Sequence, residues 1–446
     1  MAAEAGDVIS RYRQLQASHL IEARSVVNEA SFGLFSTTID QINDPTRLAD
    51  IQRDEPTPVL GRPGSGGDGT PRILFTGLAN RAEVHAFQVG GIYGMESGNL
   101  AGYLAWRESN SDSRHDSGSS YFNGNQADAS ATELMLAWGQ RGETSNWGVT
   151  GSYLSGDRGN TISDTSSVFW DQSEASRYAV SGAFQNHARE DFTWTVSGNV
   201  ASGDMIDDGG WRNSLVFNRL RWDFDTFTWG GGVRLNWYQE GDHPGAFEVV
   251  GSYDSMTGDL NHPTIFMRSN GVQYDETATR DDFSASNATL GLRWQKQLAG
   301  GVDFGAGFMW DSYEIDADFA GNVTDTAYTP AALGRFVTQA SMEGDTLSIP
   351  TSVRAGIGEK WTVVVGAEFW RSEVDIKTYD LYPSVPVSED RLRSHRSDTG
   401  TDYAMALRYQ HGESVTAELG FHSGSYVGAR HTLQTSEVTF LVGVSY

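Results

Sequence analysis

Two acidic segments of the sequence contain residue types that could bind a divalent cation. They are 204–209, which reads DMIDDG, and 314–318, which reads EIDAD. Calcium-binding loops place oxygen ligands at alternate positions along the chain. Ile206 occupies the second such position in the first segment, and Ala320 occupies the third in the second. We therefore expect no dedicated metal site, and either loosely bound cations or a solvated acidic surface.

A second set of residues could act on solutes through charge. We assign nine charged side chains to the inward face of a sheet whose apolar face points outward: Arg219, Arg221, Arg234, Arg293, Arg408, Asp223, Asp303, Glu368 and Glu418. A charged lining selects ions or polar solutes by its field. Because both signs are present, the same residues could instead form an ion-pair network that braces the wall. The sequence leaves both interpretations open.

The elements that would position these charges are β-strands, because the chain alternates between apolar and polar residues from about residue 71 to the end. The last segment shows the pattern most clearly: Val438, Phe440, Val442, Val444 and Tyr446 alternate with small or polar neighbours. The same period of two recurs at 403–409, 361–369, 288–294 and 134–138. A period of two indicates strands with one apolar face.

The connections between these segments predict the topology. Short turns lie near 96–98, 142–144, 189–190, 299–300, 359–360 and 412–413, and longer loops near 110–130, 157–173, 240–282, 318–345 and 379–399. Strands of about ten residues with this alternation of connections are typical of outer-membrane barrels. We predict an all-β fold, a transmembrane antiparallel up-and-down β-barrel of about 14 to 16 strands over residues 71–446. The segment 73–78 is the weakest strand candidate.

A soluble all-β fold, such as a sandwich or a propeller, is the alternative. Aromatic residues near the short turns and strand ends, including Trp147, Trp194, Trp229 and Trp361, favour the barrel because they match an interfacial girdle. No run of 18 or more apolar residues occurs, which excludes a membrane-spanning helix.

Composition excludes several other classes. Among 446 residues there is no cysteine, so a disulfide scaffold and cysteine-ligated metal sites are excluded. Lys and Arg total 32 against 58 Asp and Glu, which gives a net charge of −26. A chain this acidic has no general electrostatic footprint for nucleic acid, so we expect no nucleic-acid partner.

Residues 1–70 differ from the remainder. From 7 to 30 there is no Gly or Pro, and apolar residues recur at helical spacing, which predicts an amphipathic helix within the N-terminal region. A Pro- and Gly-rich stretch over 53–70 predicts a loop. We expect this region either to plug the barrel lumen or to dock a periplasmic or surface protein.

The final strand, 438–446, resembles the terminal signature of bacterial outer-membrane proteins, which end in an aromatic residue. This resemblance implies location in the outer membrane of a Gram-negative bacterium, contact of Phe440, Val442, Val444 and Tyr446 with lipid, and recognition by the barrel-assembly machinery. The segment 347–370 looks like a late hairpin of the FadL-type transporters of hydrophobic compounds. That family has a fourteen-stranded barrel and an N-terminal hatch with an Asn-Pro-Ala motif. Residues 43–46, which read NDPT, depart from this motif.

One pair of residues invites an enzymatic interpretation. His395 and Ser397 have the spacing found in outer-membrane phospholipases, but they lie in a predicted loop and lack the flanking Asn-Gly of that family. Gly-x-Ser-x-Gly, His-Glu-x-x-His and phosphate-loop motifs are absent from the sequence. We therefore expect no catalytic residues and no cofactor.

Together these patterns predict a passive uptake channel, porin-like or FadL-like, for small solutes or hydrophobic compounds. A route for hydrophobic compounds would need apolar side chains in the lumen. Met309 and Trp370 are the only ones that we identify on otherwise polar inward faces. The alternative is a non-conducting structural or docking barrel that anchors partner proteins at the outer membrane.

Overall fold

The structure of the chain is a computed structural model. It describes residues 25–37, 40–49, 57–58, 72–80, 84–95, 97–113, 124–163, 167–213, 216–261, 264–268, 273–298, 300–323, 334–381, 389–412, 415–427 and 432–445.

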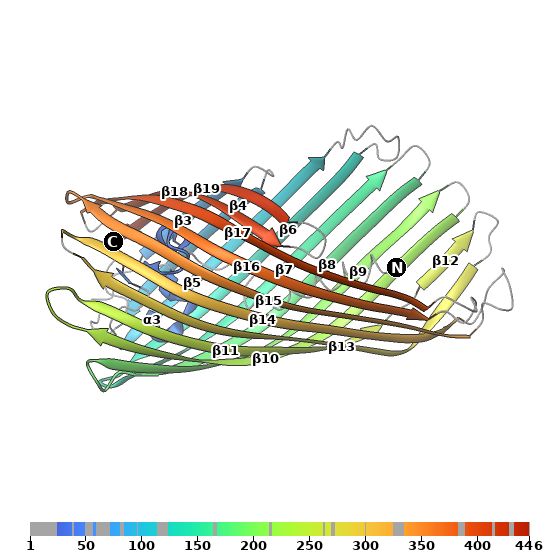
Figure 1. Ribbon diagram of the computed structural model, residues 1–446, viewed down its shortest axis with the longest axis horizontal. Coiled ribbons are helices and arrows are strands. Elements are labelled where there is room, and N and C mark those ends of the chain that lie inside the picture. The colour runs from blue at the N-terminus through green and yellow to red at the C-terminus, as the bar shows by residue number, and fades with distance from the viewer. Residues whose placement is uncertain are drawn as a thin grey trace.

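The described strands form one closed antiparallel barrel (Figure 1). Its strands are β3 (Arg72–Asn80), β4 (Val84–Met95), β5 (Gly98–Ser113), β6 (Gly124–Arg141), β7 (Ser145–Ser163), β8 (Ser167–Asn186), β9 (Phe192–Asn213), β10 (Val216–Gln239), β11 (Gly245–Asn261), β12 (Thr264–Arg268), β13 (Gln273–Gln297), β14 (Val302–Val323), β15 (Gly334–Ile357), β16 (Trp361–Leu381), β17 (Glu389–His411), β18 (Val415–Val427) and β19 (Thr432–Ser445).

The sheet closes where the last strand meets the first. β19 pairs with β3, so that Ser445 lies opposite Arg72. β11 and β12 both pair with β10 and β13, so they form one interrupted strand and the described barrel has sixteen strand positions. This number confirms the predicted range, and the weak candidate at 73–78 is β3. It exceeds the fourteen strands of the FadL-type family.

Alternation along each strand separates the outer surface from the lumen. In β6, Leu136 is 59% exposed, whereas its neighbours Met135 and Ala137 are buried. In β19, Phe440 is 47% exposed and Leu441 is 1% exposed. The described strands therefore carry an apolar outer face, as the period of two predicted.

The strands are much longer than the predicted ten residues. β13 has 25 residues, and β10 and β15 have 24 each. Predicted loops at 110–130, 157–173, 318–345 and 379–399 are largely strand, and the predicted loop at 240–282 contains β11, β12 and the start of β13. These predictions were wrong because backbone pairing continues where Ser, Asp, Asn and Gly leave no apolar face to detect. The strands extend well beyond the 9 to 11 residues, roughly, that cross a bilayer.

The short turns at 142–144, 189–190 and 359–360 are at the predicted places, whereas a further short turn, at 240–244, falls in the predicted long loop 240–282. Gly358 and Gly412 have φ of 67° and 61°, a left-handed conformation that favours glycine in a tight turn. The β6–β7 turn is closed by a hydrogen bond from the backbone N–H of Gly142 to the carbonyl oxygen of Ser145 (2.8 Å).

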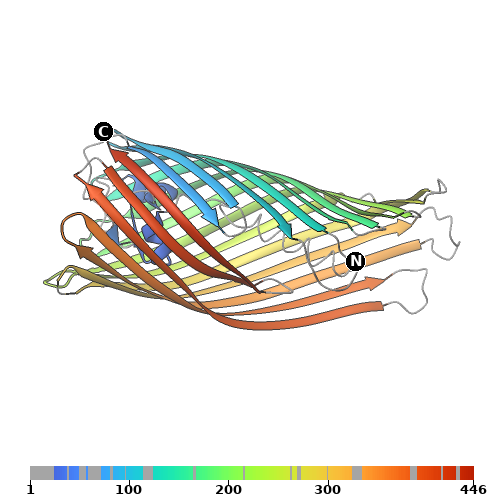
Figure 2. The same ribbon diagram turned by 90° about the horizontal axis from the view of Figure 1, so that it is seen from above.

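The described part of the N-terminal region lies inside the barrel, at the end where the short turns and the C-terminus are found (Figures 1 and 2). It contains α2 (Val26–Ala30), β1 (Phe35–Ser36), η1 (Asp40–Asn43), α3 (Pro45–Leu48) and β2 (Thr57–Pro58), which pairs with β1. We call residues 25–37 and 40–49 the lumen segment. Of the predicted helix 7–30, residues 7–24 lie outside the described residues. No helix in the described ranges is long and apolar enough to cross a membrane.

Candidate functional site

The barrel wall is shaped to receive the lumen segment. α2 contacts β16 to β19, and α3 contacts β5 to β8, so the segment reaches widely separated parts of the wall. Glycines face it where the approach is closest: Gly139, Gly148, Gly366 and Gly420. A Cβ atom at Gly366 would overlap the carbonyl oxygen of Ala30, and one at Gly420 would overlap a methyl group of Val26. Close packing of this kind indicates a built interface.

On the α2 side, a buried ion pair anchors the start of the helix. Arg408 and Glu418 lie directly opposite each other on β17 and β18. Arg408 Nη1 donates to Glu418 Oε1 (2.8 Å), and Glu418 Oε2 accepts the backbone N–H of Val26 (2.9 Å). Both charged side chains are almost completely buried. The pair therefore satisfies one of the backbone donors that a helix N-terminus leaves unpaired.

A second pair holds the chain after α2. Arg354 on β15 lies opposite Asp303 on β14, and its Nη2 is 2.7 Å from Asp303 Oδ2. The guanidinium of Arg354 also lies over the ring of Phe35, 5.0 Å from its centroid, in cation–π geometry.

Asp40 ties the two ends of the α2 region together. Its carboxylate accepts hydrogen bonds from the backbone N–H of Ser25 (2.7 Å) and of Thr37 (2.6 Å), and from the Ser25 hydroxyl (2.7 Å). Burial raises the pKa of the Asp40 carboxyl, although these hydrogen bonds oppose the rise.

On the α3 side, Asp44 caps the helix and begins an ionic network. Asp44 Oδ1 accepts the backbone N–H of Thr46 (3.0 Å), and Pro45 occupies the first turn. This is the arrangement expected of an N-cap residue followed by proline. The wall contributes Asn99 Nδ2, which donates to the carbonyl oxygen of Leu48 (2.7 Å).

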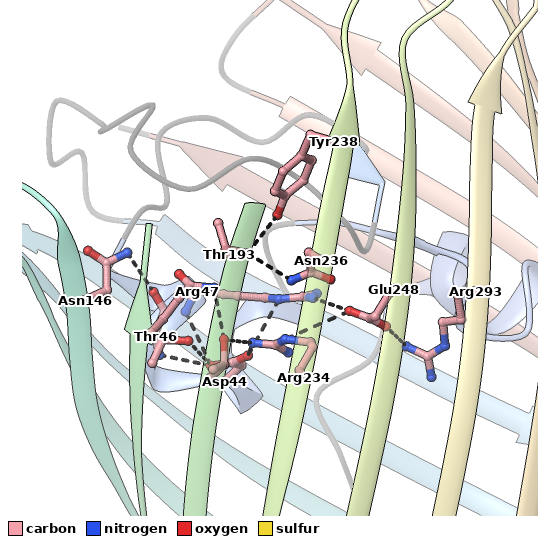
Figure 3. Close-up of polar contacts among 12 residues, drawn as sticks. Asp44, Thr46, Arg47, Asn146, Thr193, Arg234, Asn236, Tyr238, Glu248 and Arg293 are labelled. Carbon is pink, nitrogen blue, oxygen red and sulfur yellow. Dashed lines mark hydrogen bonds and ion pairs between the residues drawn. The ribbon is translucent and has the colours of Figure 1, made fainter. Parts of the chain in front are cut away.

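The network links α3 to three wall strands (Figure 3). Asp44 pairs with Arg234 of β10, and Arg47 Nε lies 3.6 Å from Asp44 Oδ2. Glu248 of β11 lies 3.2 Å from Arg47 Nη2, 3.1 Å from Nη1 of Arg293 and 3.9 Å from Nε of Arg234. Three guanidinium groups thus share two carboxylates.

Electrostatics fixes the protonation of Asp44. Burial alone would raise the pKa of its carboxyl, but the positive charges of Arg234 and Arg47 and its hydrogen bonds hold that pKa well below the usual range. Asp44 is therefore ionised under all ordinary conditions, and its bonds to both arginines are charge-assisted.

A cavity of about 740 Å³ lies between the lumen segment and the wall. Its lining is mainly polar and includes Arg47, Arg234 and Arg293 on one side and Glu368 and His422 on others. Met309 and Trp370 lie outside this lining. The cavity can therefore hold water and polar solutes, and it offers little apolar surface to a hydrocarbon.

Of the nine residues that we predicted to line the lumen, six have side chains that the structure describes and three do not. Arg234, Asp303 and Arg408 form the ion pairs described above, as do Arg293 and Glu418, and Glu368 lines the cavity. The side chains of Arg219, Arg221 and Asp223 lie outside the described residues.

Sequence reasoning missed four partners: Asp44, Arg47, Glu248 and Arg354. Glu248 lay in a segment interpreted as loop, although its alternation with Phe247 was a usable signal. Asp44 had a capping signal in the proline that follows it.

The remaining predictions concern the terminal strand, His395 and metal binding. Val442 is partly exposed, and the side chains of Val444 and Tyr446 lie outside the described residues. His395 is in β17 and not in a loop, and its Nδ1 lies 3.0 Å from Asp375 Oδ1. Within the described ranges, no group of three His, Cys, Asp or Glu side chains is arranged to hold a metal ion.

Comparisons with known proteins give only loose likeness. No family model and no curated protein matches the chain. Similar solved structures include the toluene transporter TodX of P. putida, with 12% identity, 95% of this chain and 98% of that chain covered, and a TM-score of 0.46. The monoaromatic hydrocarbon channel CymD has 9% identity, coverage of 95% and 98%, and a TM-score of 0.41. The siderophore receptor PiuA of Acinetobacter baumannii has 9% identity, coverage of 85% and 82%, and a TM-score of 0.39. The geometry alone therefore defines the chain as a closed antiparallel β-barrel with an apolar outer face and an occupied lumen.

Proposed function

We propose that the protein is an outer-membrane β-barrel, embedded in lipid through its apolar outer face. Exposed apolar side chains recur on strand after strand, including Leu136, Trp229, Phe369 and Phe440. A water-soluble monomer does not expose an apolar surface of this extent, whereas a transmembrane barrel requires it.

We further propose that the barrel is a passive uptake channel for small solutes and that the lumen segment is its plug. The observation that carries this proposal is the polar, charged cavity between the lumen segment and the wall. A scaffold has no need for such a cavity, whereas a solute route does. Sixteen strands also enclose an interior wider than wall side chains alone can fill, so a plug is physically required to close it.

The two ends of the plug differ in how readily they can leave the wall. The α2 end is held by the hydrogen bond from Val26 to Glu418 and by buried apolar side chains, and the α3 end is held by ion pairs of Asp44 and Arg47 with wall residues beside the cavity. We propose that the channel opens by release of the α3 end, while the α2 end remains attached.

Single-channel recording in planar bilayers tests this function. Deleting residues 2–60 should leave a folded barrel, checked by heat-modifiable gel mobility, and raise its conductance severalfold. A folded barrel whose conductance is unchanged by the deletion would contradict the plug role.

The second candidate function is a non-conducting barrel that anchors partner proteins. It is favoured by the packing of the lumen segment against β5 to β8 and β16 to β19, which leaves it held on widely separated parts of the wall. A scaffold should be electrically silent as the full-length chain, under applied voltage and at all solute concentrations, and it should retain a bound periplasmic or surface protein on purification.

A further inference from the structure

The arginine cluster of the α3 side contains more positive charge than its carboxylates neutralise. Arg47, Arg234 and Arg293 contribute three charges, and Asp44 and Glu248 contribute two of opposite sign. Within the described contacts, each guanidinium therefore retains N–H donors that no carboxylate accepts, since a guanidinium has five.

These arginines lie at the cavity. All three arginines line it, whereas Glu248 is fully buried behind them and is not part of the lining. Arg293 donates from Nη1 to Glu248 (3.1 Å). Its Nη2 lies near Gly33, a residue of the lumen segment that also lines the cavity. Glu248 thus contacts all three guanidinium groups from outside the cavity lining.

Among the described contacts, none of the other carboxylates of the lining forms an ion pair with these arginines. Asp40 is occupied by its hydrogen bonds from Ser25 and Thr37. Glu29 accepts a hydrogen bond from the hydroxyl of Thr439 (3.2 Å). Glu368 belongs to β16, which β14 and β15 separate from β13 in the sheet.

We propose that Arg47, Arg234 and Arg293 form a binding site for the oxyanion group of a small hydrophilic solute, a carboxylate or a phosphate. Converging guanidinium groups bind such oxyanions through paired, charge-assisted hydrogen bonds. The site deepens the proposed function, on which it rests, because it names the chemical class of solute that the cavity would bind.

Binding is measured by isothermal titration calorimetry on the full-length chain in detergent, with inorganic phosphate and acetate as separate probes at constant ionic strength. Arg293→Gln is the test variant, because Glu248 keeps its contacts to Arg47 and Arg234. Arg189→Gln is the matched control, since Arg189 pairs with Asp191 on an exposed turn (2.8 Å).

The wild type and R189Q should bind at least one probe saturably, and R293Q should bind it about tenfold more weakly. Stronger binding of phosphate or of acetate identifies the class of oxyanion. Absence of saturable binding by the wild type, or equal binding by R293Q, overturns the proposal. A channel that conducts but binds neither probe refutes this site alone, whereas binding without conductance upholds the site and contradicts the channel function.

Discussion

The two attachments of the lumen segment to the wall solve the problem of buried charge in different ways. On the α2 side, Arg408 and Glu418 pair directly with each other within the wall, and Arg408 is only 2% exposed. On the α3 side, the side chains of Arg47 and Arg234 are each 17% exposed, and they share carboxylates with Arg293 beside a cavity.

The difference indicates which attachment can open. Release of α2 would break the hydrogen bond from the Val26 N–H to Glu418 and would expose Val26, Val27 and Phe35, which are almost completely buried, to water, and this costs free energy. Asp44, Arg47 and Arg234 are partly exposed to a cavity, so water or a dissolved anion that enters it can replace one of their partners. The α2 side is therefore suited to be a permanent anchor, and the α3 side is suited to be a latch.

The largest effect is expected at the anchor. Glu418→Gln should lower the free energy of unfolding by about 3 to 5 kcal/mol, because it removes the charged partner of the buried Arg408. Urea unfolding of the barrel from lipid vesicles measures this loss. Glu373→Gln is the control, since Glu373 pairs with Arg371 at a partly exposed position and should change stability by less than about 1 kcal/mol. Equal losses in the two variants would remove the distinction between anchor and surface pair.

A smaller loss is expected from crowding the anchor. Gly420→Ala places a methyl group against Cγ1 of Val26, a residue whose backbone is held by the hydrogen bond to Glu418. We expect a loss of about 1 to 3 kcal/mol, the usual penalty of overpacking. Gly151→Ala is the matched control, because a Cβ at Gly151 meets no atom within 4 Å. If both glycines tolerate alanine equally in the same unfolding experiment, the wall does not fit α2 closely.

At the latch, a change should affect opening more than folding. Asp44→Asn keeps a good helix cap but removes the charge that pairs with Arg234 and Arg47. We expect the docked state to lose roughly 1 to 2 kcal/mol, or about tenfold in the frequency of channel opening. Asp191→Asn, on an exposed turn, is the control for single-channel recording. An unchanged opening frequency in D44N would show that the α3 side is not the latch.

The smallest expected effects are changes of stability with pH. They have opposite signs for Asp44 on the α3 side and Asp40 on the α2 side. The pKa of Asp44 is depressed, so its stabilisation is present above the unfolded pKa and is lost only as pH falls through the lower folded value. The stability difference between wild type and D44N should therefore stay constant from pH 7 to about pH 5.

Asp40 has a raised pKa, so its contribution is present below the unfolded pKa and declines as pH rises through the folded value. The wild type should therefore lose stability relative to Asp40→Asn as pH rises above about 4. Melting temperatures of the wild type, D40N and D44N across this range check both slopes. Parallel curves for the two variants would show that the carboxyls are not perturbed in opposite directions.

The barrel was predictable from sequence because lipid-facing positions repeat every second residue, as in β19. Strand length was not, because segments such as 110–113 and 159–163 pair through their backbones without an apolar face. Pairing register also sets which charges meet: Asp303 was found by alternation, but its partner Arg354 follows only from the β14–β15 register.

The latch was harder to predict because its partners are distant in the chain. Asp44 and Arg234 are 190 residues apart, and no local pattern in either segment specifies the other. The capping role of Asp44 is a local property and could be predicted, whereas its ionic role depends on where the closed barrel places the lumen segment.

A disulfide across the anchor tests most directly whether the α3 side opens while the α2 side stays attached. The chain has no cysteine, and a Cβ at Gly420 lies 3.6 Å from the Cβ of Val26, which suits a disulfide. The double variant Val26→Cys with Gly420→Cys, alone and combined with Asp44→Asn, should be recorded in bilayers before and after reduction. Our account predicts that openings persist in the oxidised channel and that D44N raises their frequency about tenfold in both states. Silence of the oxidised channel, restored by reduction, would contradict it.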